Sequence, residues 1–167
     1  MALVVALVVL VALLMVSSAR SARGAPDADL ADLGWQWPVR PVLIEWAFVA
    51  PAHDYAPGHR GIDLRPTLDD DVRAPADGVV AFAGSVAGRG ILTIDHGGGL
   101  VTTFEPVVTE LAVGAVVAQG DVVASLTGGG HSAPGTVHFG VRLDGEYINP
   151  VLLLGGVPRA VLLPCCD

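Results

Sequence analysis

Two residues of the segment His59-Arg-Gly-Ile-Asp63 are of the types that bind borderline metal ions. An imidazole and a carboxylate stand four positions apart, and Gly61 between them allows the backbone to bend so that both side chains reach one ion. Zinc accepts nitrogen and carboxylate ligands together, and catalytic zinc sites use three protein ligands with one position left for water. The pair therefore predicts part of a zinc site that needs a third ligand from elsewhere. The alternative is a pair of surface residues near a turn.

His138 is the best candidate for that third ligand. It lies in the strand-like run Val137-His-Phe-Gly-Val141, which follows the glycine-rich stretch 128–135. Because side chains alternate between the two faces of a strand, we expect His138 to share a face with Thr136 while Val137 packs on the other. Such a strand delivers a side chain to a cleft. The alternative for His138 is a hydrogen-bonded histidine of the core.

The elements that must position these residues are β-strands. From Trp35 onward, short runs rich in Val, Ile and Phe are separated by Gly, Pro and Asp, and helical periodicity is almost absent. Two stretches, 72–81 and 113–124, look loosely alike, each with glycine flanked by Val-rich alternation, as in a sheet that folds back on itself. We therefore predict an all-β fold of the barrel or sandwich type. Strands are expected at 42–48, 78–83, 90–95, 100–104, 115–118, 122–126 and 137–143.

The two ends of the chain differ in composition from this middle. Residues 2–16 form an unbroken apolar run, shorter than the roughly 20 residues of a transmembrane helix, and small residues at Ser17 and Ala19 suit signal-peptidase cleavage. We predict a signal peptide at 1–19, a linker at 20–34, the β domain at 35–154 and a C-terminal tail at 155–167. The expected location is secreted, or extracytoplasmic, and the alternative is an anchor formed by an uncleaved signal. Cys165 and Cys166 belong either to an accessory tail or to a vicinal or intermolecular bridge.

Charge and composition exclude several classes of function. The 167 residues include 9 Lys+Arg and 17 Asp+Glu, for a net charge of −8, and every one of the nine cations is Arg. A nucleic-acid partner is not expected, because binding it requires cations that neutralise phosphates. The absence of Lys excludes Schiff-base enzymes and carriers with lipoyl or biotinyl groups.

Four blocks occur in order along the chain, namely Tyr55-Ala-Pro-Gly-His-Arg-Gly-Ile-Asp-Leu64, Val72-Arg-Ala-Pro-Ala-Asp-Gly-Val-Val80, Thr93-Ile-Asp-His-Gly-Gly-Gly-Leu-Val101 and Val137-His-Phe-Gly-Val141. Together they make the chain resemble the lysostaphin or LytM type of zinc metallopeptidase, and within it the short secreted branch of actinobacteria. The resemblance spans about residues 35–154. It implies an antiparallel β-sheet core of the barrel-sandwich (duplicated hybrid) type and activity on peptide cross-links of bacterial cell-wall peptidoglycan. It also implies a zinc ion (Zn²⁺) held by His59, Asp63 and His138.

The chain departs from this family at two positions. The family's two histidines that assist catalysis without binding the metal fall on Pro106 and Thr136, and neither side chain can transfer a proton near neutral pH. General acid and base groups are each worth about a hundred- to ten-thousand-fold in rate. The resemblance therefore leaves two functions open, a peptidase and a non-catalytic module that binds peptidoglycan or regulates another hydrolase.

Four further residues are candidates around such a site. His131 and Glu105 are candidates to replace the missing proton-transfer groups. The alternative for His131 is an exposed loop histidine, and the alternative for Glu105 is a solvated residue on the opposite face of its strand. His53 and Tyr55 are candidates for the lining of a substrate groove. His96, in contrast, is expected to orient a hairpin turn. A third interpretation is a carrier domain of a sugar-phosphotransferase system, whose phosphoryl-accepting histidine lies in a similar sequence context. An export signal argues against it, because that chemistry depends on cytosolic partners.

Overall fold

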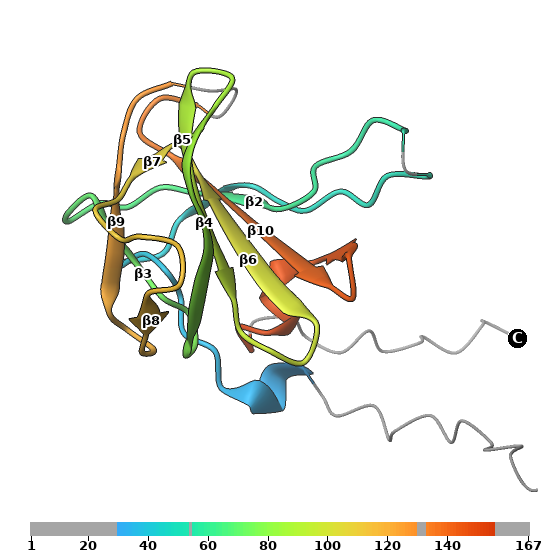
Figure 1. The fold of residues 1–167 in the computed structure, drawn as a ribbon. Coiled ribbons are helices and arrows are strands. Elements are labelled where there is room, and N and C mark those ends of the chain that lie inside the picture. Colours follow the sequence, from blue (N-terminus) through green and yellow to red (C-terminus); the bar gives the residue numbers. More distant parts are fainter. Residues whose placement is uncertain (1–29, 54, 130–132, 156–167) are drawn as a thin grey trace, which may run out of the picture.

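The fold is known from a computed structural model that describes residues 30–53, 55–129 and 133–155. The predicted all-β class with antiparallel sheets is confirmed in this part of the chain (Figure 1). The elements in chain order are η2 (Leu30–Leu33), β1 (Ile44–Trp46), β2 (Ile62–Leu64), β3 (Asp71–Arg73), β4 (Gly78–Val86), β5 (Arg89–Asp95), β6 (Leu100–Glu105), β7 (Val107–Val108), β8 (Val116–Val117), β9 (Val122–Leu126), β10 (Val137–Leu143), β11 (Glu146–Ile148) and η3 (Pro150–Leu152).

The strands form one large sheet and one small sheet. The large sheet has the order β1-β2-β10-β6-β5-β4-β8, with β11 paired to the far end of β10, and the small sheet has the order β3-β9-β7. Every pairing of named strands is antiparallel. In Figure 1 the small sheet lies at the left of the large one, and the buried residues of both belong to a single cluster.

Alternation along β6 shows how the sequence divides the large sheet into two faces. Leu100, Thr102 and Phe104 are buried, whereas the residues between them are partly exposed. The Phe104 ring stacks on Phe139 of β10, with 5.1 Å between ring centroids. One face therefore packs the core, and the other is free to carry polar side chains.

The seven predicted strands are all present, with boundaries that shift by a few residues. Four strands were not predicted, namely β2, β3, β7 and β11, each two or three residues long. A segment of this length cannot display a two-residue period, so pairing with longer neighbours determines its conformation. The two similar stretches lie side by side, because β3 pairs with β9 and β4 pairs with β8.

A long loop between β1 and β2 projects from the body of the domain (Figure 1). The predicted signal peptide, His131 and the cysteine pair lie outside the described residues. Within residues 30–53, 55–129 and 133–155, no helix is long and apolar enough to cross a membrane.

Candidate metal centre

Strands β2 and β10 bring the predicted metal ligands together. Asp63 of β2 is the direct register partner of His138 of β10, and paired residues of antiparallel strands project from the same face. His59 precedes β2, where its backbone exchanges two hydrogen bonds with Val49, at 2.9 and 3.0 Å. Two segments nearly 80 residues apart in sequence are thus fixed against each other by the backbone.

The three ligand atoms form a tight triangle. The distance is 3.1 Å from His59 Nε2 to Asp63 Oδ1, 2.8 Å from His138 Nδ1 to Asp63 Oδ1, and 3.1 Å between the two histidine nitrogens. His59 and Asp63 are buried and His138 is partly exposed, so the triangle opens to solvent on the side of β10. It is the only group of three or more His, Cys, Asp or Glu side chains with this proximity among the described residues.

Two neighbours fix the orientation of His59. Its Nδ1 lies 2.8 Å from the Ala47 carbonyl oxygen, which can only accept, so Nδ1–H donates and the Nε2 lone pair points at the triangle. The Trp46 indole stacks on the same imidazole, with 4.5 Å between centroids and 16° between planes. Trp46 is nevertheless 56% exposed, and sequence reasoning did not single it out.

The environment favours the charged form of Asp63. Burial raises the pKa of its carboxyl, but the hydrogen bond from His138 and the charges of both histidines outweigh burial, so the pKa lies below its ordinary value. The carboxylate is therefore available as an anionic ligand. The ring nitrogens of His59 and His138 complete a mixed nitrogen and oxygen donor set.

This donor set fits a zinc ion. Tetrahedral zinc with bonds of about 2.0–2.1 Å holds its ligand atoms about 3.3 Å apart. The observed separations need to widen by only a few tenths of an ångström. With three protein ligands, a fourth position remains for water or substrate, as in catalytic zinc sites.

Gly61 lies in the predicted backbone bend, and it is required for a second reason, the close approach of two strands. A Cβ at this position would lie 2.6 Å from His138 Nε2 and 2.5 Å from the Phe139 carbonyl oxygen. Glycine therefore allows β2 and β10 to approach closely enough for Asp63 and His138 to meet. The predicted backbone bend and the predicted convergence of the ligands are both observed.

Pro106 and Thr136 share one cavity. They help to line a space of about 390 Å³ together with residues that include Gly135 and Leu126. Thr136 lies just before β10, only 1% exposed, and its hydroxyl donates to the Ala133 carbonyl at 2.7 Å. The structure thus brings together the two positions at which the sequence departs from the resembled family, and neither carries a proton-transfer group.

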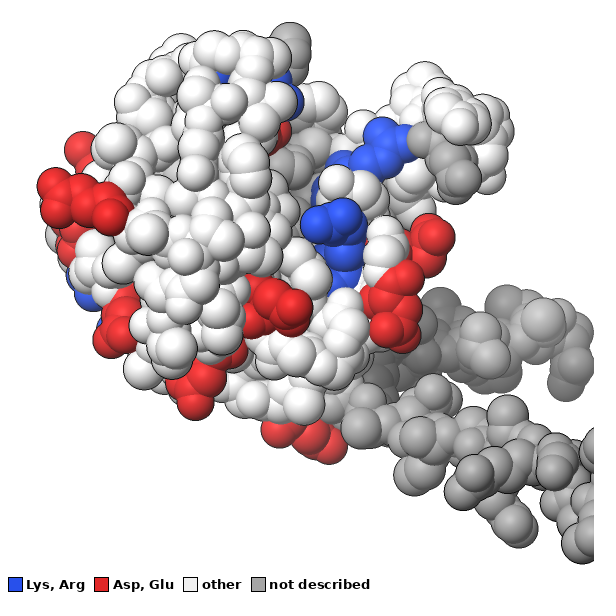
Figure 2. All heavy atoms as spheres, viewed as in Figure 1, with Lys and Arg blue, Asp and Glu red and all other residues white. Residues whose placement is uncertain are grey.

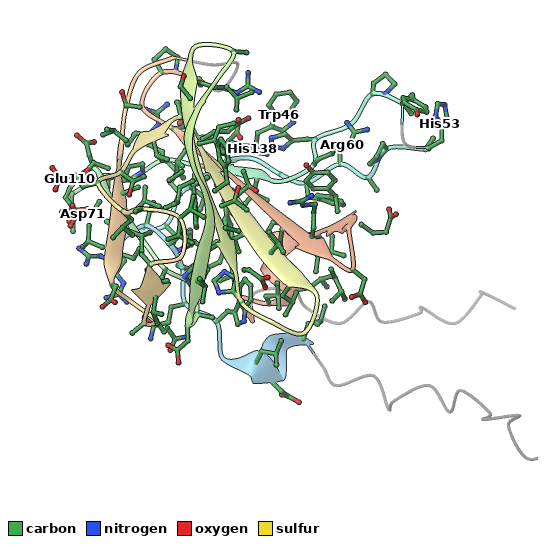
Figure 3. All side chains as sticks on the ribbon, in the orientation of Figure 1. Trp46, His53, Arg60, Asp71, Glu110 and His138 are labelled. Carbon is green, nitrogen blue, oxygen red and sulfur yellow. The ribbon has the colours of Figure 1, made fainter. Side chains whose placement is uncertain are left out.

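The structure places the remaining predicted site residues in different surroundings. Glu105 of β6 is the register partner of His138, so its side chain projects from the face that carries the ligands. His53 lines a groove of about 550 Å³ beside Arg60, Glu146 and Tyr147, whereas Tyr55 is 94% exposed and not among the lining residues. In Figure 3, Arg60 and His53 lie along the projecting loop, and Figure 2 shows arginine atoms between this loop and the body.

His96 is not near the ligand triangle. Its Nδ1–H donates to the Asp77 carbonyl at 2.8 Å, and its Nε2 lies 2.9 Å from the Thr102 hydroxyl. The Trp35 ring packs against it, with 4.7 Å between centroids. Burial lowers the pKa of His96 despite the hydrogen bonds that oppose this shift. This histidine is structural, as predicted, and stabilises the turn after β5.

An antiparallel sheet with a His-Asp-His triangle open on one face defines a metallopeptidase-like domain. Residues 57–150 match peptidase family M23, and the chain belongs to this family. The fold resembles the solution structure of lysostaphin, with a TM-score of 0.58, 18% identity and coverage of 75% of this chain and 56% of that one. The predicted family resemblance is confirmed.

Two relatives place the domain within longer proteins. The uncharacterized protein Rv2891 of Mycobacterium tuberculosis (strain H37Rv) is 36% identical over 129 residues, which cover 73% of this chain and 52% of that protein. The DD-carboxypeptidase/endopeptidase Mpg of Neisseria meningitidis serogroup B is 32% identical over 94 residues, covering 56% of this chain and 22% of Mpg. The chain thus spans about half the length of the first relative and a smaller share of the second.

Proposed function

We propose that this protein is an exported zinc peptidase that cleaves peptide cross-links of bacterial cell-wall peptidoglycan. The observation that carries the proposal is the triangle of His59, Asp63 and His138, which offers three ligand atoms and an open fourth position. Membership in peptidase family M23 supports it, as does the relative Mpg, whose name describes a DD-carboxypeptidase and endopeptidase.

The chemistry follows from the ligand set. When bound, a zinc ion with three protein ligands lowers the pKa of its water towards neutrality and polarises the carbonyl of the bond to be cleaved. Asp63 supplies negative charge, and the Ala47 carbonyl keeps the His59 imidazole in the required tautomer. His138 is the ligand nearest to solvent, so the substrate carbonyl approaches over β10.

Export by an N-terminal signal belongs to the same proposal, since peptidoglycan lies outside the cytoplasmic membrane. The apolar run 2–16 and the small residues before Arg20 support it. The net charge of −8 suggests that contact with anionic wall polymers is short-ranged, because salt screens repulsion beyond roughly 10 Å.

A second function is favoured by Pro106 and Thr136. With no proton-transfer group on either side chain, the domain would bind peptidoglycan, or regulate another hydrolase, without cleaving. The zinc triangle would then serve recognition or stability.

Digestion of purified peptidoglycan separates the two functions. We expect the zinc-loaded protein to release peptide fragments, detected by mass spectrometry, and the His138→Ala variant to release none. The Pro106→His, Thr136→His double variant is the matched gain-of-function control. Two results together would favour the non-catalytic module. The double variant would cleave peptidoglycan while the natural protein does not, and the natural protein would still sediment with peptidoglycan.

A further inference from the structure

Glu105 stands next to the ligand triangle on the same face of the large sheet. Strands β2, β10 and β6 are neighbours, and Asp63, His138 and Glu105 are successive register partners across them. Directly opposed residues of antiparallel strands have Cβ atoms about 4.5–5.5 Å apart. The Glu105 carboxylate is therefore placed beside His138, the ligand that borders solvent, and not on the opposite strand face.

Arg89 of β5 holds this carboxylate in place. Its Nε–H donates to Glu105 Oε2 at 2.7 Å, and the two side chains are 23% and 24% exposed. Shielding from water strengthens such a charge-assisted bond relative to a surface ion pair. No other described residue hydrogen-bonds the second oxygen, Oε1, so one oxygen is fixed while the other is available to a ligand.

The neighbourhood explains why a carboxylate is useful at this position. Glu105 directly precedes Pro106, and its register partner His138 follows Thr136 by two residues. Glu105 is therefore close in the fold to both positions that lack a proton-transfer group, which line one cavity. Carboxylates act as general bases in other zinc peptidases. A rigid carboxylate beside the ligands can therefore fill the function that Pro106 and Thr136 cannot.

We propose that Glu105 is the proton-transfer residue of this peptidase and that Arg89 is its positioning residue, an inference that rests on the proposed function. Glu105 takes one proton from the attacking water while the water oxygen forms a bond to the scissile carbonyl carbon. The same proton passes to the amide nitrogen as the C–N bond breaks, and the bonding pair leaves with nitrogen. The products are one carboxylic acid and one amine, so the hydrolysis balances without another reactant.

The decisive variants are Glu105→Gln, which keeps the shape of the side chain, and Arg89→Gln. The matched control is Glu110→Gln, because Glu110 is an exposed glutamate at the left edge of the domain in Figure 3, away from His138 near the centre. Each variant is assayed for zinc affinity, thermal unfolding, kcat and KM on a cross-linked muropeptide. We expect Glu105→Gln to lower kcat by about 10²- to 10⁴-fold. Its zinc affinity should stay within about twofold of the natural protein, whereas His138→Ala loses zinc.

A double-mutant cycle distinguishes positioning from a structural ion pair. If Arg89 acts through Glu105, Arg89→Gln lowers kcat in the natural background but has no further effect on kcat in the Glu105→Gln background. Arg89→Lys should restore part of the lost kcat. Normal kcat in Glu105→Gln would overturn the inference and leave the peptidase intact. A natural protein that binds zinc and cleaves nothing would overturn both, and loss of zinc in Glu105→Gln would assign Glu105 to metal binding.

Discussion

Replacing Gly61 with alanine tests whether close approach of β2 and β10 creates the metal centre. The added Cβ would lie 2.6 Å from His138 Nε2 and 2.5 Å from the Phe139 carbonyl oxygen, whereas ordinary contact begins at 3.4 Å. Strand β2 cannot move away easily, because Ile62 and Leu64 on either side of Asp63 are fully buried. We therefore expect the His138 imidazole to move, together with the β10 backbone at Phe139, whose carbonyl oxygen makes the other short contact.

The size of the effect follows from these distances. Relief of the contact with Nε2 requires a displacement of about 0.8 Å. Zinc sites tolerate deviations of only about 0.2 Å in their bond lengths, so His138 can no longer complete the triangle without strain. Loss of a supporting residue typically costs 10- to 100-fold in metal affinity, and misplacement of a ligand itself should cost at least about a hundredfold. Overpacking should also destabilise the metal-free domain by about 1–3 kcal/mol.

Competition with a chromogenic chelator measures zinc affinity, and thermal unfolding in the presence of a chelator measures the stability of the metal-free domain. The matched control is Gly140→Ala, whose Cβ would lie 3.7 Å from the same His138 Nε2 and 3.4 Å from the nearest atom, the Arg60 carbonyl oxygen. We expect this control to bind zinc within about twofold of the natural protein. A folded Gly61→Ala protein that binds zinc as tightly as the natural one would refute the reasoning.

Three further predictions concern His96, Trp46 and the export signal. The pKa of His96 is lower in the folded than in the unfolded chain, so the unfolded chain takes up a proton at a higher pH. The free energy of unfolding should therefore be highest above the ordinary histidine pKa of about 6.5 and should decline as pH falls below it. The slope is at most about 1.4 kcal/mol per pH unit, and urea titrations should show a flatter dependence in His96→Gln. Zinc binding to His59 should change the fluorescence of Trp46, which stacks on that imidazole, and Trp46→Phe should abolish the response; an unchanged spectrum in a protein shown to hold zinc would contradict this prediction. Mass spectrometry of the protein recovered outside the cytoplasm should find a chain that begins at Arg20, whereas a chain that retains 1–19 would support the membrane anchor.

The sequence was sufficient to predict the longer strands, because β4, β5, β6 and β10 carry enough Val, Ile and Phe for their pattern to be read. The short strand β2 was not predicted, although it carries Asp63. Three residues display no period, and its position depends on pairing with β1 on one side and β10 on the other. The sequence alone does not indicate such pairings, because the paired strands are far apart along the chain.

The candidate site shows the same division. The spacing of His59 and Asp63 and the strand around His138 predicted the three ligands, and the structure brings them together. Arg89 was not singled out, because its pairing with Glu105 depends on the register of β5 against β6. Trp46 was missed for a related reason, since its contact with His59 depends on the path of the loop between β1 and β2. These contacts come from tertiary structure, and no local sequence pattern encodes them.

The zinc content of the purified protein, determined by elemental analysis beside the His138→Ala variant, tests the proposed metal centre most directly. The geometry of His59, Asp63 and His138 predicts about one zinc ion per chain of the natural protein and none in the variant. A natural protein that is free of zinc at neutral pH after exposure to the metal, or a His138→Ala variant that retains a full equivalent, would contradict it.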